Sequence, residues 1–90
     1  MRSGEVRAIG RATSCDFAIG DRTVSRQHAE LRRTSDGWVL RDLDSSNGTR
    51  GNGWLVEEQT LHSGDVIEFG GAAYVFEPPH GAPNVPQSLP

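Results

Sequence analysis

Val66-Ile67-Glu68-Phe69-Gly70-Gly71-Ala72-Ala73-Tyr74-Val75-Phe76 is the stretch of sequence that decides the fold class. Two short runs of apolar and aromatic residues, Val66–Phe69 and Ala73–Phe76, flank a glycine pair. This arrangement predicts a β-hairpin, because a glycine pair supplies the turn and short β-prone runs supply the strands.

Short runs with a two-residue period recur upstream, and Ser-, Asn- and Gly-containing turns separate them. In His28–Arg32, for example, Ala29 and Leu31 point to one side of the predicted strand. No window of a dozen residues carries a helical stripe. The pattern predicts an all-β protein, an antiparallel β-sandwich of short strands whose functional surface is the loops at one end. The other predicted strands are Val6–Ile9, Phe17–Ile19, Trp38–Leu43 and Trp54–Val56.

The length of 90 residues predicts a single small domain, and the prolines mark its boundary. All five prolines lie at or after Pro78, so we expect a domain over residues 1–77 and a Pro-rich tail or linker over residues 78–90. The sequence has no apolar run long enough to span a membrane and no signal-type segment after Met1. Together with the single Cys15, this predicts a cytoplasmic protein, or a cytoplasmic domain of a larger one.

The charged residues exclude several classes of function. All nine basic residues are arginine, which excludes lysine-dependent chemistry, and the net charge of −3 argues against a nucleic-acid partner. An arginine site for a single anion stays possible. Codon bias, as in a GC-rich bacterial source, would also produce an all-arginine set. Cys15 and the histidines lack the spacing of a zinc site, so no metal and no cofactor is predicted.

The polar residues that could bind an anion lie in the predicted loops. A phosphate needs arginine charge, hydroxyl and amide donors and a rigid frame, and five loop residues could supply them. Taken singly, each has a structural alternative: serines and asparagines often only form turns, a loop arginine is usually solvated, and a histidine such as His28 is more often a buried support than a catalyst. The five candidates are Arg11, Ser25, Arg26, Ser46 and Asn47.

The same residues form an ordered series of motifs. These are Ile9-Gly10-Arg11, Val24-Ser25-Arg26-Gln27-His28-Ala29, Asp42-Leu43-Asp44-Ser45-Ser46-Asn47-Gly48-Thr49, Asn52-Gly53, and Leu61 with Gly64-Asp65-Val66-Ile67. In this order and spacing, they resemble the forkhead-associated domain. The resemblance covers about three-quarters of the chain.

This resemblance implies an eleven-stranded sandwich that binds phosphothreonine peptides through loops at one end. Arg11 and Ser25 would contact the phosphate, and Arg26 would add a phosphate or peptide contact. Ser46 would lie beside the threonine methyl group and the phosphate, and Asn47 would hold the peptide backbone beyond the phosphothreonine. Five residues would support the site: Gly10, His28 and Gly48 by shaping the loops, and Asn52 and Gly53 by forming a second turn.

One departure from the family pattern concerns the first strand. The family has a strand upstream of the one that enters Gly10-Arg11, and here only nine residues precede Gly10. Val6–Ile9 must then be the second strand, and the first is missing or truncated. An exposed strand edge recruits another chain, so we expect possible self-association or marginal stability.

Three function classes remain, and the first is favoured. The first is a non-catalytic module that recognises phosphothreonine in a partner, such as a Ser/Thr kinase or its substrate. The second is a phosphate-independent interaction or self-association domain of the same fold. The third is an enzyme with Ser25, His28 and Asp42 as a triad. It is disfavoured because no G-x-S-x-G motif surrounds any serine, so no catalytic residue is predicted.

Overall fold

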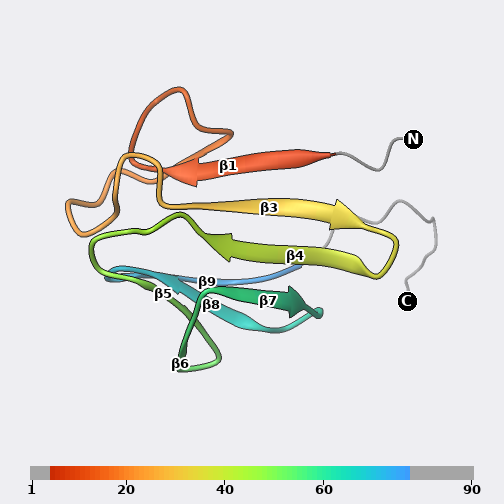
Figure 1. The fold of residues 1–90 in the computed structure, drawn as a ribbon. Helices are drawn as coiled ribbons and strands as arrows, with labels where there is room; N and C mark the ends of the chain where they lie inside the picture. Colours follow the sequence, from red (N-terminus) through yellow and green to blue (C-terminus); the bar gives the residue numbers. More distant parts are fainter. Residues whose placement is uncertain (1–4, 78–90) are drawn as a thin grey trace, which may run out of the picture.

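The computed structural model describes residues 5–77, which fold into two packed sheets (Figure 1). These residues contain no helix, and hence none that could span a membrane. The predicted tail over residues 78–90 lies outside the described residues. The nine strands are β1 (Val6–Gly10), β2 (Phe17–Ala18), β3 (Ala29–Thr34), β4 (Gly37–Asp42), β5 (Thr49–Gly51), β6 (Trp54–Val56), β7 (Glu58–Leu61), β8 (Val66–Phe69) and β9 (Ala72–Val75).

The sheet topology confirms the predicted antiparallel sandwich. One sheet has the order β2-β1-β3-β4-β7 and the other the order β6-β5-β8-β9. Six of the seven strand pairs are antiparallel, and only the two-residue contact between β1 and β2 is parallel. β1 and β4 end, and β3 and β5 begin, at the same end of the sandwich, so the loops that join them gather there (Figure 1).

The core lies between the sheets and follows the two-residue period of the strands. Ala29 and Leu31 of β3 are buried, as their predicted common face requires, and Leu40 of β4 is fully buried beside them. Ile67 and Phe69 of β8 face them from the second sheet. The apolar alternation read from the sequence thus produced the layer that holds the two sheets together.

The structure corrects the strand predictions in two respects, the number of strands and the positions of some strand ends. Two strands, β5 and β7, were missed, because Thr49-Arg50-Gly51 is short and ends in glycine, and Glu58-Gln59-Thr60-Leu61 has only one apolar residue. The predicted strand ends at Ile19, His28, Leu43 and Phe76 also lie outside the observed strands. Residues 5–77 therefore contain nine strands rather than the eleven that the resemblance implies.

The Asn52-Gly53 pair forms a tight hairpin turn between β5 and β6. Both residues have positive φ, 52° and 90°, as the two-residue turn that joins twisted antiparallel strands requires. Asn52 also bonds to the loop before β8: its amide group donates to Asp65 Oδ1 (3.1 Å), and its oxygen accepts the Val66 amide (2.9 Å). This second turn therefore braces the β7–β8 loop.

Gly10, the last residue of β1, lies in close contact with the loop that precedes β3. A Cβ on Gly10 would lie 2.2 Å from the carbonyl oxygen of Arg26, whose position is held by hydrogen bonds from the Ala12 amide (3.1 Å) and the Cys15 thiol (3.4 Å). Backbone atoms cannot move aside as the end of a side chain can. A glycine at this position lets the two loops approach each other.

We expect Gly10→Ala to destabilise the domain by about 1–3 kcal/mol, because the added methyl group forces the Arg26 backbone to move. Gly20→Ala is the matched control, since a Cβ there meets no atom within 4 Å. Urea unfolding of both variants measures the difference. Equal midpoints for the two variants would contradict the close contact.

Candidate functional site

The candidate binding residues lie on three loops at one end of the sandwich (Figure 1). Arg11 begins the β1–β2 loop, Ser25 and Arg26 lie between β2 and β3, and Ser46 and Asn47 lie between β4 and β5. Direct hydrogen bonds join these loops, so residues up to 36 positions apart in the sequence form one surface.

Arg11 is tied to the loop before β3. Its backbone amide donates to the Ser25 carbonyl (2.9 Å), and its side-chain Nε donates to the Val24 carbonyl (3.0 Å). These two bonds fix the direction of the side chain and leave its two terminal amino groups free for a ligand. The Arg11 side chain is exposed.

The second and third loops are joined through Ser25 and Thr23. Ser25 Oγ accepts the Ser46 amide (3.0 Å), so the serine hydroxyl hydrogen is still available to a ligand. The Asn47 side-chain amide donates to the Thr23 carbonyl (2.8 Å), which leaves the Asn47 oxygen as an acceptor. Ser46 and Asn47 are both exposed. The loop tips therefore present both donor and acceptor groups to solvent.

His28 is fully buried and supports both loops from below. Its Nδ1 accepts the Ser25 amide (3.0 Å), so Nε2 carries the hydrogen that is donated to the Gly48 carbonyl (2.9 Å). The ring packs edge-on against Phe69 of the core, with 5.6 Å between ring centroids. One imidazole thus holds the Ser25 loop and the Asn47 loop at a fixed separation, and both ring nitrogens are occupied.

Gly48 allows the third loop to turn above β5. Its φ of 85° is the left-handed conformation that favours glycine, and a Cβ there would lie 2.7 Å from Leu55 Cδ1. Gly48 also receives the His28 bond on its carbonyl. Gly48 therefore provides both the left-handed turn conformation and the carbonyl that binds His28.

A second, partly buried network holds the third loop, and the sequence motif gave none of its residues a role in supporting that loop. Asp42 Oδ1 accepts the hydroxyls of Ser45 (2.5 Å) and of the fully buried Thr49 (2.6 Å), and Oδ2 accepts the Ser45 amide (3.1 Å). Ser45 Oγ in turn accepts the Gly48 amide (2.9 Å). An aspartate followed three residues later by serine was the available signal, because such pairs close turns through side-chain hydrogen bonds.

This network sets the protonation of Asp42. Burial acts to raise the pKa of Asp42, but the hydrogen bonds from the Ser45 hydroxyl, the Thr49 hydroxyl and the Ser45 amide outweigh it, so the pKa lies below its ordinary value. Asp42 lies 3.9 Å from His28 Nε2, which is beyond hydrogen-bond distance. The carboxylate is therefore an ionised structural acceptor and not the partner of the histidine.

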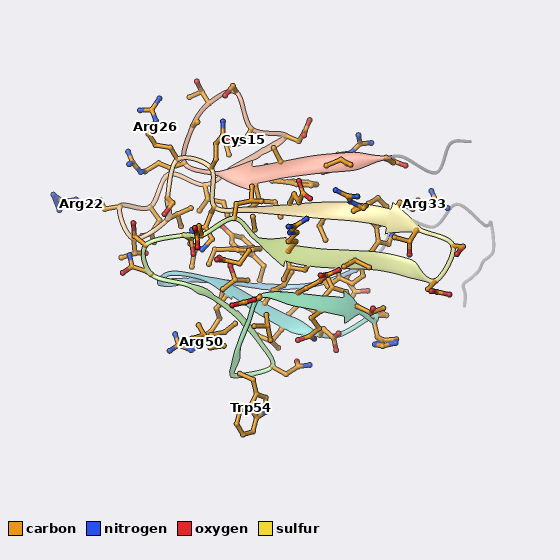
Figure 2. All side chains as sticks on the ribbon, viewed as in Figure 1. Cys15, Arg22, Arg26, Arg33, Arg50 and Trp54 are labelled. Carbon is orange, nitrogen blue, oxygen red and sulfur yellow. The ribbon has the colours of Figure 1, made fainter. Side chains whose placement is uncertain are left out.

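Arg26 and the second turn lie at the margins of this surface. The Arg26 side chain is exposed and points outward from the loop end (Figure 2). Asn52 and Gly53 lie in the β5–β6 turn, and Asn52 bonds to Asp65 and Val66 rather than to the three loops. Within residues 5–77 no group of three potential metal ligands comes together.

We expect Asp42→Asn to remove stability that the wild type has at neutral pH. A carboxylate with a lowered pKa stabilises the fold above the unfolded-state pKa, near 3.8, and this contribution is lost as the pH falls through the folded-state pKa. The variant should be less stable than the wild type by about 1–3 kcal/mol at pH 7, and the difference should shrink below pH 4. Thermal unfolding from pH 7 to pH 2.5 measures this difference.

Asp44→Asn is the control for this titration. Asp44 is exposed and has a φ of 60°, a conformation that asparagine also adopts readily. Its substitution should leave the stability at pH 7 within about 0.5 kcal/mol of the wild type, as is usual for an exposed position. A difference between Asp42→Asn and the wild type that stays constant down to pH 2.5 would show that the network does not depend on the charge.

Known proteins with this arrangement identify the family. The family model described as FHA domain matches residues 7–70. The ABC transporter ATP-binding/permease protein Rv1747 of Mycobacterium tuberculosis is 45% identical over 73 residues, which are 81% of this chain and 8% of that protein. The oxoglutarate dehydrogenase inhibitor of Corynebacterium jeikeium is 40% identical over 80% of this chain and 50% of that protein. The chain thus spans half or less of these curated relatives.

A solved structure agrees with the sequence relatives. It was described under the heading of phosphothreonine-dependent FHA domain interactions, and it is 38% identical to this chain, with a TM-score of 0.76. The similarity covers 87% of this chain and 82% of the solved one. Because the family model spans most of the chain and the fold agrees with it, this chain belongs to the FHA domain family, the forkhead-associated family that its motifs resemble.

Proposed function

We propose that this chain is a non-catalytic module that binds phosphothreonine-containing segments of partner proteins through the three joined loops. The observation that carries the proposal is the contact between Ser25 and Ser46, because it brings a free hydroxyl donor onto the surface beside Arg11. The similarity to an FHA structure described by phosphothreonine-dependent interactions supports the choice of ligand.

The charges of the loop end favour a phosphate over a neutral ligand. A phosphate monoester carries a charge of about −1.5 to −2 at pH 7, and guanidinium groups bind it through paired hydrogen bonds. Arg11 and Arg26 form no ion pair within residues 5–77, so their charges are available to a ligand. Two arginines and the Ser25 hydroxyl together match one phosphate group.

The remaining loop residues account for the peptide part of the ligand. Asn47 keeps its side-chain oxygen free to accept a backbone amide of the peptide just beyond the phosphothreonine. Ser46 lies beside the phosphate position, where the threonine methyl group would pack. Burial of one methyl group contributes only about 0.8 kcal/mol, so a strong preference for phosphothreonine over phosphoserine would also need a fixed orientation of the side chain.

The partner follows from the chemistry of the ligand. Phosphothreonine in a protein is the product of a Ser/Thr kinase, so the bound protein is such a kinase or one of its substrates. The module would then work in the compartment where the kinase domain acts, which for a bacterial protein is the cytoplasm. The role is to recruit one protein to another in signalling.

We expect Arg11→Ala and Ser25→Ala each to weaken binding of a phosphothreonine peptide by roughly ten- to a hundred-fold, because each removes a charge-assisted hydrogen bond worth about 1.5–3 kcal/mol. Fluorescence anisotropy with a degenerate phosphothreonine library, beside phosphoserine, phosphotyrosine and unphosphorylated libraries, gives the affinities. Arg33→Gln, near the end of β3 that lies opposite the binding loops (Figure 2), is the matched control. Full binding by the Arg11→Ala, Ser25→Ala double variant would rule out this site.

A specific feature also favours self-association as a second function. The first sheet ends at β2 and β7 and the second at β6 and β9. The edge beside β1, which the sequence led us to expect bare, is partly covered: β2 pairs with Ile9 and Gly10, and the Ala8 amide donates to Asp16 Oδ2 (2.7 Å). Within residues 5–77, β9 is an edge strand that pairs on one side only, and it has no charged residue and no proline.

An apolar cleft of about 410 Å³ opens beside this edge, between β9 and the β1–β2 edge of the facing sheet. Phe17 and Tyr74 line it and stay about half exposed, at 50% and 47%. The Tyr74 ring packs against Phe69 of the core, with 6.3 Å between the ring centroids, and it is also accessible to water. Such a surface favours a partner that is itself apolar.

A second copy of the chain fits this edge. In an antiparallel pair, directly opposed residues point to the same face, so two β9 strands with Tyr74 opposite Tyr74 would form one continuous sheet and turn the two clefts toward each other. No like charges meet, because the strand is Ala72-Ala73-Tyr74-Val75.

We expect the chain to form a dimer at high micromolar concentration and Ala73→Lys to make it monomeric, because a lysine on the strand edge opposes pairing. Sedimentation equilibrium measures both states, and an unchanged melting temperature shows that the variant still folds. Thr60→Lys, on the β7 edge, is the control. A monomeric wild type over this range, or a dimer that Ala73→Lys leaves intact, would contradict the proposal.

A further inference from the structure

The arginines of the described residues divide into two groups by their partners. On the sheets, Arg7 pairs with Glu5, Arg32 with Glu30 and Arg33 with Glu5, and Arg41 and Arg50 lie directly opposite glutamates on neighbouring strands. At the loop end, three arginines form no ion pair within residues 5–77 and also have no acidic cross-strand neighbour. They are Arg11, Arg22 and Arg26.

Arg22 is not needed to bind the first phosphate of the ligand. Arg11 and Arg26 match the charge of a single phosphate monoester, and each lies beside Ser25, either through a hydrogen bond or in the sequence. Arg22 lies three residues before Ser25, on the other side of Thr23. In Figure 2 its side chain extends farthest outward at the loop end. Its charge has no assigned partner in the complex.

The backbone that carries Arg22 is held in a fixed turn. The Val24 amide donates to the Asp21 carbonyl (3.0 Å), and Asp21 Oδ1 accepts both the amide (2.8 Å) and the hydroxyl (2.5 Å) of Thr23. The hydroxyl oxygen of Thr23 also accepts the Gly71 amide (2.7 Å) from the β8–β9 turn. Arg22 is therefore presented from a rigid base, although its own side chain is exposed.

The neighbouring carboxylate of Asp21 is used inside this turn. Hydrogen bonds from the Thr23 hydroxyl and the Thr23 amide lower the pKa of Asp21, so it stays ionised and bound to Thr23. It forms no ion pair with Arg22. The turn thus orders the carboxylate toward Thr23 and the guanidinium toward solvent.

The position of Arg22 places it close to the path of a bound peptide. The carbonyl of Thr23, the next residue, accepts the side-chain amide of Asn47 (2.8 Å). Asn47 is the residue that would hold the peptide backbone beyond the phosphothreonine. Arg22 directly precedes Thr23, and its side chain extends outward. In the proposed complex it would contact the residues that flank the phosphothreonine.

We infer that Arg22 reads a second negative charge on the phosphopeptide, near the phosphothreonine. This inference rests on the proposed function. A guanidinium binds a carboxylate or a phosphate through two parallel hydrogen bonds, so the second charge is either an acidic side chain or a second phosphorylated residue. The module would then select acidic or doubly phosphorylated segments over other phosphothreonine segments.

The test is a positional scan with the intact chain. Peptides with one phosphothreonine in an alanine background carry a single glutamate, or a single second phosphothreonine, at each position from four before to four after the first. Affinities are measured for the wild type, for Arg22→Gln and for the control Arg32→Gln, whose side chain is on β3. Each series is repeated at high salt, where an exposed ion pair weakens.

We expect at least one position where glutamate tightens binding by about two- to five-fold, the range of an exposed ion pair. A second phosphate should tighten it more, because it carries more charge. Arg22→Gln should lose this gain and keep the affinity for the peptide that carries only the one phosphothreonine, whereas Arg32→Gln should keep both. If the glutamate series and the phosphothreonine series give their largest gain at different positions, the series whose gain Arg22→Gln removes identifies the group that Arg22 reads.

Two results would overturn the inference. One is a flat profile in the wild type, and the other is a charge preference that Arg22→Gln leaves unchanged. In both cases the plain phosphothreonine peptide would still bind, and the proposed function would stand. Loss of binding to every phosphothreonine peptide by folded wild-type protein would instead refute the proposed function together with this inference.

Discussion

The pair of hydrogen bonds made by the buried His28 is the constraint on which the rest of the loop end depends. The ring accepts from the Ser25 amide and donates to the Gly48 carbonyl, so it joins two loops that are more than twenty residues apart in the sequence. An imidazole in this tautomer has one acceptor and one donor, and both are used. Because the ring also packs on Phe69, the positions of the loops are set by the core.

The half-buried carboxylate of Asp42 supports the same loop end as the histidine. It accepts hydrogen bonds from the hydroxyls of Ser45 and Thr49 beneath the third loop, and Ser45 Oγ in turn accepts one from the Gly48 amide. The Gly48 carbonyl thus accepts a bond from His28, and the Gly48 amide donates one to Ser45 of this network. The exposed residues Ser46 and Asn47 directly precede Gly48, so the end of their loop is held by both bonds and little freedom is left for a ligand to remove.

The charges of the molecule are distributed to match this frame. Arginines on the sheets pair with glutamates or lie opposite them, whereas Arg11, Arg22 and Arg26 on the loops form no ion pair within residues 5–77. The apolar cleft beside β9 lies between the sheet edges, and its lining includes no residue of the candidate phosphate site. Peptide binding and self-association would therefore use separate surfaces of one domain.

The sequence determined the fold class, most of the strands and the residues of the candidate site. The two-residue alternation in His28–Arg32 and Val66–Phe69 identified the buried faces, because burial on one side of a sheet imposes that period. The strand ends and the polar strand β7 were missed, since hydrogen bonding to a neighbour, and not side-chain pattern, defines them. The order of the motifs identified the family and placed Arg11, Ser25 and Asn47 on loops.

Only the tertiary structure decided how these loops meet. The contacts from Ser46 to Ser25 and from Asn47 to Thr23 join distant segments, and no local pattern encodes such a pairing. The role of Asp42 as an acceptor for Thr49 depends on the burial of Thr49 and the partial burial of Asp42, which the motif does not show. Within residues 5–77, the position of β9 at the edge of its sheet likewise follows from the order of the strands. Sequence patterns report which face of a strand is buried, but the neighbours of a strand are set by the free energy of the whole assembled fold.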